Sequence, residues 1–173
     1  AMLGTSDIAK IADVIKKVTS EKQEYVCEIS QNPVFVYPEH AQRQQITVGS
    51  SSYIKIADGC NYQCGYCVIP QLRGPYRSRP IENIVQEAKE LGKKGVSEIV
   101  LIAQDTTGYG IDLYKKPSLA KLLKELNKIE DINWIRVMYT YPSMFDDELI
   151  DAFANCDKVV KYVDIPLQHS HPD

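Results

Sequence analysis

The chain has 173 residues, of which 44% are hydrophobic and 25% are charged, a composition typical of one globular domain or slightly more. Its formal net charge of -3 argues against a general binder of nucleic acid or of membrane surfaces, which would carry a basic excess. No apolar run reaches the roughly 18 residues of a membrane-spanning helix, and no signal peptide is apparent. Three of the five cysteines fall within eight positions, which favours a metal site in a reducing cytoplasm over a disulfide framework.

Residues 5–18 predict an amphipathic helix, because isoleucine and valine recur there at spacings of three and four. Thr5, Ser6 and Asp7 offer oxygens that could cap its first turn. The helix has no local partner, so we expect it to be the end of a domain that lies upstream. Residues 21–50 predict a linker, with a short strand at 34–37.

From residue 51 onward the sequence alternates between strand and helix patterns. Helices are predicted to begin at Pro80, at Ser118, which would cap its helix, and at Asp146. The predicted strands cover 53–57, 98–102, 134–138 and 159–164. This βαβαβαβ order implies parallel strands with right-handed crossovers. The fold class is therefore α/β, either a small open sheet or a partial parallel (β/α) TIM-like barrel truncated to about four strands.

The cysteine motif is Cys60, Cys64 and Cys67, spaced CxxxCxxC directly after the first predicted strand. Three thiolates on one short loop can hold three corners of a 4Fe-4S cluster and leave the fourth iron open to a ligand. Structural zinc is the plainer alternative. Zinc normally takes four protein ligands in paired spacings, and no second pair is present in this sequence.

Polar and aromatic residues also follow the other predicted strands. They are Gln104 and Asp105 after the second, Tyr139 to Tyr141 after the third, and Gln168 and His169 after the fourth. Ligands of parallel α/β folds bind beyond the carboxyl ends of the strands, so we expect a site at this edge. Ordinary loop polarity or helix capping would explain Gln104 or Asp105 equally well if either stood alone.

CxxxCxxC with an aromatic residue before the last cysteine, here Tyr66, resembles the signature of the radical S-adenosylmethionine (SAM) superfamily. The resemblance implies that Cys60, Cys64 and Cys67 ligate a 4Fe-4S cluster whose free iron chelates SAM. It implies that Tyr66 lies near the adenine and that Gln104 and Asp105 lie where the superfamily contacts the SAM amino group. The usual sequence at that position is Gly-Gly-Glu, from which this chain departs. With Gln168 these are the candidate cofactor-binding residues, and no catalytic residue is expected beyond the cluster ligands.

The chain is most similar to the methylthiotransferases of the RimO branch, in four segments: 59–61, 73–80, 102–107 and 164–169. This resemblance implies methylthiolation of the β-carbon of an aspartate in small-subunit ribosomal protein twelve, with an electron donor such as a flavodoxin. The tRNA-modifying MiaB branch is the nearest alternative, and it tends to read differently after the second and fourth strands. An electron-transfer iron-sulfur module is an alternative of another class, although no fourth cysteine stands at ferredoxin spacing.

The resemblance also predicts the domain organisation. Residues 1–20 would be the C-terminal helix of the family's N-terminal domain, residues 21–50 a linker, and residues 51–173 the first part of the radical SAM core. The family's second cluster and its C-terminal TRAM domain would lie outside this chain, so we expect a fragment that cannot complete methylthiolation alone. Cys27 and Cys156 do not match the auxiliary cluster ligands. Arg73, Arg77 and Arg79 are interpreted as surface or ion-paired arginines rather than as substrate contacts.

Overall fold

The computed structural model describes residues 1–20, 25–30 and 49–167, and these form two compact units. The first unit consists of Ala1–Val36 together with Gly59–Pro75, and the second of Tyr37–Asp58 together with Tyr76–Asp173. The predicted strand at 34–37, most of the predicted linker, and Gln168 lie outside the described residues. No helix in the described ranges is both long and apolar enough to span a membrane.

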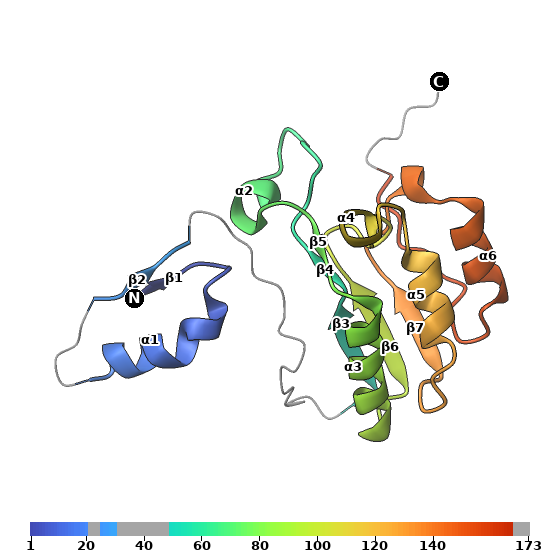
Figure 1. Ribbon diagram of the computed structural model, residues 1–173, viewed down its shortest axis with the longest axis horizontal. Coiled ribbons are helices and arrows are strands. Elements are labelled where there is room, and N and C mark those ends of the chain that lie inside the picture. The colour runs from blue at the N-terminus through green and yellow to red at the C-terminus, as the bar shows by residue number, and fades with distance from the viewer. Residues whose placement is uncertain (21–24, 31–48, 168–173) are drawn as a thin grey trace. The chain divides into compact units, whose positions relative to one another are not determined.

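The second unit is built on a parallel sheet whose strand order is β3-β6-β7 (Figure 1). The strands are β3 (Ser51–Lys55), β6 (Glu98–Ile102) and β7 (Trp134–Val137). Their register pairs Ile54 with Leu101 and Leu101 with Val137. The mixed α/β class with a parallel sheet is therefore confirmed.

The predicted strand at 159–164 is wrong as a strand, because only Val159 forms a parallel bridge, to Ile135. Backbone bonds from Ile135 N to Lys158 O (2.8 Å) and from Val160 N to Ile135 O (2.9 Å) flank that bridge. The chain then leaves the ladder, with Tyr162 and Val163 46% and 47% exposed. The described sheet therefore has three strands and one bridging residue rather than four strands.

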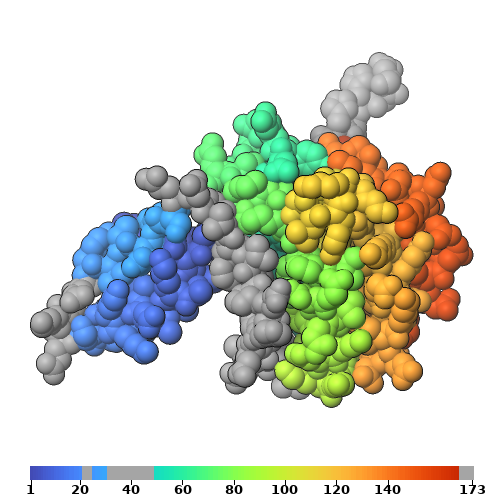
Figure 2. Space-filling model, in the orientation of Figure 1, coloured from blue at the N-terminus to red at the C-terminus, as the bar shows by residue number. Residues whose placement is uncertain are grey.

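Three amphipathic helices accompany the sheet: α3 (Ile81–Lys93), α5 (Leu119–Leu126) and α6 (Asp147–Asn155). Helix α5 contacts both α3 and α6, and the three form one continuous surface of this unit (Figure 2). Asp146 caps α6 as expected, because its carboxylate accepts a hydrogen bond from Leu149 N at 2.8 Å. Ser118 precedes α5 without capping it, since its hydroxyl donates to Lys116 O instead.

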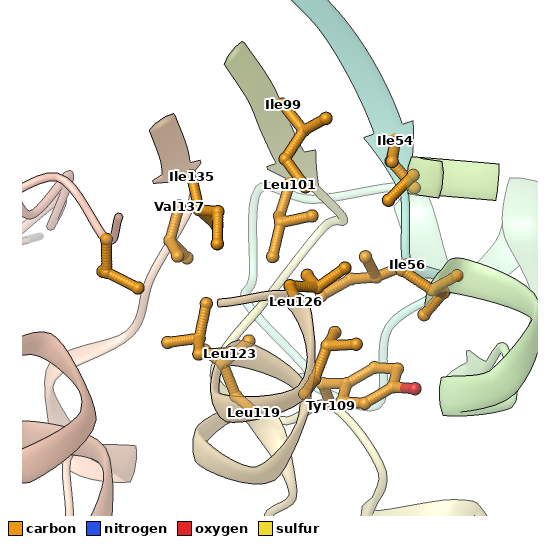
Figure 3. Packing of buried hydrophobic residues seen from close by; sticks show 14 of the residues in the cluster. Ile54, Ile56, Ile99, Leu101, Tyr109, Leu119, Leu123, Leu126, Ile135 and Val137 are labelled. Atoms are coloured by element: carbon orange, nitrogen blue, oxygen red, sulfur yellow. The ribbon is translucent and has the colours of Figure 1, made fainter. Parts of the chain in front are cut away.

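The core lies between these helices and one face of the sheet. Alternate strand residues, among them Ile54, Leu101 and Val137, point toward Leu119, Leu123 and Leu126 of α5 (Figure 3). The other face of the sheet carries Tyr53 and Trp134, which are 60% and 58% exposed, and an ion pair between Arg136 and Glu98 at 2.8 Å. The first face is therefore apolar and buried, whereas the second carries the more exposed and polar side chains, although Val100 on it is buried.

The first unit contains a short parallel pair, β1 (Met2–Leu3) with β2 (Cys27–Glu28), a 3-10 turn (η1, Ile8–Lys10), and helix α1 (Ile11–Val18). The expected helix therefore begins three residues late, at the 3-10 turn. Asp7 does not cap it, because its carboxylate accepts hydrogen bonds from Ser30 N (2.8 Å) and Ser30 Oγ (2.7 Å). These bonds, with help from Lys10, lower the pKa of Asp7.

Candidate functional site

The cysteine motif lies on a loop of the first unit, Gly59–Pro75, that contains the short helix α2 (Ile69–Arg73). The loop starts directly after β4 (Ala57–Asp58) and ends just before β5 (Arg77–Ser78), and these two strands pair antiparallel. Sequence reasoning missed this ladder, because two residues are too few to show a period. The ladder matters because it joins the two ends from which the cysteine loop emerges.

The two ends of the cysteine loop, Gly59–Cys60 and Gly74–Pro75, approach each other closely, and we call this point the neck of the loop. The φ of Gly59 is +82°, and a Cβ built there would stand 2.2 Å from Pro75 O and 2.6 Å from Gly74 O. Cys60 N donates to Gly74 O at 3.2 Å across the same neck. Only glycine permits both this left-handed backbone and this close approach of the two chain segments.

Replacing Gly59 by alanine is expected to displace the neck and to cost the protein about 1–3 kcal/mol of stability through backbone strain alone. We also expect the variant to take up much less iron on reconstitution, because displaced loop ends would no longer hold the three cysteines in positions suited to one cluster. Iron and sulfide analysis after anaerobic reconstitution measures this. Gly65→Ala is the matched control, since no atom lies within 4 Å of the Cβ it would add and its φ is not left-handed. Equal iron uptake by the two variants would contradict the role given to the neck.

None of the three motif cysteines forms a disulfide; Cys64 is exposed, and Cys60 and Cys67 are half-buried. Within the described residues, no three His, Cys, Asp or Glu side chains stand close enough together to hold a metal ion. The three cysteines therefore lie on one loop, but their sulfur atoms are not close enough together in this structure to hold one metal ion. The donor set nevertheless fits an iron-sulfur cluster, because cysteine thiolates are the usual ligands of such a cluster and three cysteines lie here within eight residues.

Tyr66 belongs to the first unit and is 82% exposed, so its ring is accessible to a ligand. Gln104 and Asp105 belong to the second unit, where they follow β6 in one turn. The structure thus brings Gln104 and Asp105 together, and it describes Tyr66 only within its own unit.

Gln104 and Asp105 differ in what their side chains do. The Asp105 carboxylate is buried, and its Oδ1 accepts from Thr107 N (2.9 Å), Thr107 Oγ1 (2.5 Å) and Gly108 N (3.3 Å). Gln104 Oε1 is buried and has no hydrogen-bond partner among the described residues. A buried acceptor without a donor is rare in native structures, and it marks a position where a ligand can donate. Asp105 therefore shapes the turn, and Gln104 offers the open acceptor.

A set of hydrogen bonds ties the segment that follows the cysteine loop to the segment that follows β6. Tyr76 donates its hydroxyl to Asp105 O at 2.6 Å, and Ser78 N donates to Asp112 Oδ2 at 2.9 Å. Gly110 N donates to Ser78 Oγ at 2.9 Å. These residues contribute to the site indirectly, because they hold β5, the strand that follows the cysteine loop, in place. Their spacing in the sequence showed no pattern that could have identified them.

Arg79 is a structural residue. It is 7% exposed, its Nη1 lies 2.8 Å from Glu87 Oε2, and the same nitrogen donates to Lys55 O at 2.8 Å. The interpretation as an ion-paired arginine is confirmed for Arg79 and stays a prediction for Arg73 and Arg77.

The sequence pattern of the Radical SAM superfamily matches residues 54–173. This chain belongs to the radical SAM superfamily. Membership confirms the expected use of SAM and argues against both a structural zinc module and a simple electron carrier. The radical SAM methyltransferase TsrM from Kitasatospora setae, solved with its tryptophan substrate and aza-SAM, has a similar fold, with a TM-score of 0.56 at 23% identity. The match covers 72% of this chain and 23% of TsrM, and a second TsrM structure contains cobalamin and a 4Fe-4S cluster.

Curated relatives of this radical SAM chain are much more similar in sequence. The ribosomal protein uS12 methylthiotransferase RimO of Prochlorococcus marinus (strain AS9601) is 53% identical over 172 residues, which is 99% of this chain and 37% of the relative. The protein of the same name from Crocosphaera subtropica is 50% identical over 172 residues, which is 39% of its length. The chain thus spans somewhat more than a third of the length of these relatives.

Proposed function

We propose that this chain is the radical SAM core of an enzyme that attaches a methylthio group to the β-carbon of an aspartate in ribosomal protein uS12. The observation that carries the proposal is the 53% identity, over nearly the whole chain, to uS12 methylthiotransferases. The substrate is a small-subunit ribosomal protein, and the reductant is an electron donor such as a flavodoxin. Because the chain spans 37% of such a relative, we expect it to require the rest of the enzyme for the full reaction.

Each candidate residue has a distinct task in this proposal. Cys60, Cys64 and Cys67 hold a 4Fe-4S cluster, which when bound supplies the electron for reductive cleavage of SAM. Tyr66 presents its exposed ring to the adenine. Gln104 accepts a hydrogen bond from the SAM amino group through its open Oε1, and Asp105 holds the turn that aims it. Gln168 remains a predicted cofactor contact.

The more exposed face of the sheet supports a partial TIM-like barrel. In such a barrel the helices cover the outer face, and the other face lines the interior. Tyr53 and Trp134, both more than half exposed, and the Arg136–Glu98 pair occupy the face that would become that interior. The bridge from Val159 to Ile135 marks where the next strand would continue the curve.

The domain organisation is likewise a proposal. We place the C-terminal helix of an N-terminal domain at residues 1–20, a linker at 21–50 and the radical SAM core at 51–173. The exposed isoleucines of the first segment, Ile8, Ile11 and Ile15, support a further partner for α1. The compact units divide the chain differently, because the cysteine loop associates with the N-terminal segment, for example through Thr5 Oγ1 donating to Leu72 O at 2.6 Å.

The test compares two substrates with the full-length protein after anaerobic reconstitution. Purified uS12 and an unmodified tRNA transcript are each incubated with SAM, a reductant and a sulfur source, and the products are analysed by mass spectrometry. We expect the mass increment of a methylthio group on an aspartate of uS12 and no change in the tRNA. Modification of the tRNA alone would instead select the adenosine-modifying alternative. SAM cleavage without modification of either substrate would contradict the proposal.

A further inference from the structure

Tyr139 has a backbone conformation that is unusual for an aromatic residue. Its φ is +59°, and among the non-glycine residues that the structure describes only Lys115, at φ +61°, shares the left-handed region. The Cβ of a bulky residue crowds the backbone in this region, so the conformation is unfavourable unless its surroundings impose it. Such outliers persist where the strain serves a site.

Neighbouring segments impose the conformation on Tyr139 by holding both of its backbone polar groups. Tyr139 N donates to Asp164 Oδ2 at 2.8 Å, and Tyr139 O accepts from Thr106 N at 2.9 Å and from Thr106 Oγ1 at 3.1 Å. Thr106 is fully buried. The next residue, Thr140, donates its N and its Oγ1 to Asp164 O at 3.0 Å and 2.5 Å. The backbone at Tyr139 is therefore held on one side by Thr106, which follows β6, and on the other by Asp164.

The ring of Tyr139 takes no part in the hydrophobic core of the folded chain. It is 51% exposed and lies outside the hydrophobic core, and its hydroxyl makes no hydrogen bond to any residue that the structure describes. Tyr109 shows the contrast, since its ring is fully buried and its hydroxyl donates to Arg79 O at 2.6 Å. A strained backbone that holds a half-exposed aromatic ring outside the core indicates a ring placed for a ligand.

The strand order suggests which ligand. In the order β3-β6-β7, Gln104 follows β6 and Tyr139 follows the neighbouring strand β7, both within the second unit. The bond from Thr106 N to Tyr139 O joins the two strand ends. Both positions come at the carboxyl ends of parallel strands, where such folds bind their ligands. Because Gln104 is the proposed cofactor contact, a ring at the next strand end lies on the side from which a substrate can approach the cofactor.

We propose that Tyr139 is a substrate-positioning residue, whose ring contacts the peptide segment of the protein substrate that carries the modified side chain. The inference rests on the proposed function. A tyrosine ring offers a large amphipathic contact surface with few rotatable bonds. A backbone already held in its binding conformation lowers the entropy cost of association.

The test removes the ring while relieving the strain. In the full-length protein, Tyr139→Gly and Tyr139→Asn remove the ring and introduce residues that tolerate a positive φ. Tyr139→Phe keeps the ring. Calorimetric titration measures the Kd for purified uS12 and, separately, for SAM. We expect the Gly and Asn variants to bind uS12 about ten-fold more weakly and the Phe variant to lose less than about three-fold. We expect the Kd for SAM to be unchanged and the melting temperature not to fall.

Lys115→Gly is the matched control, because it relieves the same backbone strain at the end of α4 (Ile111–Tyr114) and should leave uS12 binding intact. Unchanged uS12 affinity in Tyr139→Gly would overturn the inference, as would a loss of SAM affinity equal to the loss of uS12 affinity. A wild-type protein that binds no uS12 would overturn the proposed function together with the inference. Wild-type binding that the Tyr139 variants leave intact would overturn the inference alone.

Discussion

Cys64→Ala is expected to abolish the SAM-responsive 4Fe-4S signal and all methylthiolation, because two thiolates cannot hold three corners of the cluster. The Cys64 side chain is exposed, so its removal should leave folding intact. The measurement is EPR of the anaerobically reconstituted and reduced full-length protein, recorded with and without SAM, together with the melting temperature of each variant. In the wild-type protein we expect a signal that changes when SAM is added.

Cys27→Ala is the matched control, since Cys27 is also an exposed free cysteine but lies on β2, outside the motif. It should keep the wild-type signal and its response to SAM. A Cys64→Ala protein that retains a SAM-responsive cluster would contradict the assignment of the cluster ligands. A wild-type signal that ignores SAM would contradict the open iron on which the proposed function depends.

Leu123→Ala is expected to lower the free energy of unfolding by about 3–5 kcal/mol, because it opens a cavity in the middle of the core. Leu123 is fully buried on α5 and faces the strands in Figure 3. Urea unfolding followed by circular dichroism measures the loss. Ile150→Ala removes a similar apolar side chain from α6, but Ile150 is 54% exposed, so we expect a change within about 1 kcal/mol. Similar losses at the two positions would mean that the helices do not pack on the sheet as described.

Elements with a strong local signal could be predicted from the sequence. The run Glu98–Ile102 forms β6 over its full predicted length, because a short apolar run between a helix and a polar turn has few alternatives in an α/β chain. Asp146 caps α6 because the cap is a contact between residues three positions apart. Where a distant partner competes, the local prediction is wrong. Asp7 binds Ser30 instead of capping its helix, and the segment after Val159 contacts the end of β7 again only at Asp164, which bonds to Tyr139 and Thr140.

The candidate site divides in the same way. The spacing of Cys60, Cys64 and Cys67 identified the superfamily, because ligands on one loop must be close in sequence. The sequence did not distinguish Gln104 from Asp105, which are both polar residues after the same strand. In the structure the Asp105 carboxylate accepts from Thr107 and Gly108 of its own turn, whereas the buried Gln104 oxygen has no hydrogen-bond partner among the described residues.

The cysteine motif and the main strands and helices could thus be predicted from the sequence alone, because cluster ligation, strand periodicity and helix capping each depend on short spacings. The positions that the fold alone revealed depend on residues far apart in the chain. Gly59 must be glycine because Pro75 passes 2.2 Å from where its Cβ would be, 16 residues further along the chain. Tyr139 is strained because Thr106 and Asp164 hold its backbone from both sides. Such constraints arise only when the chain folds back on itself, so no local pattern can contain them.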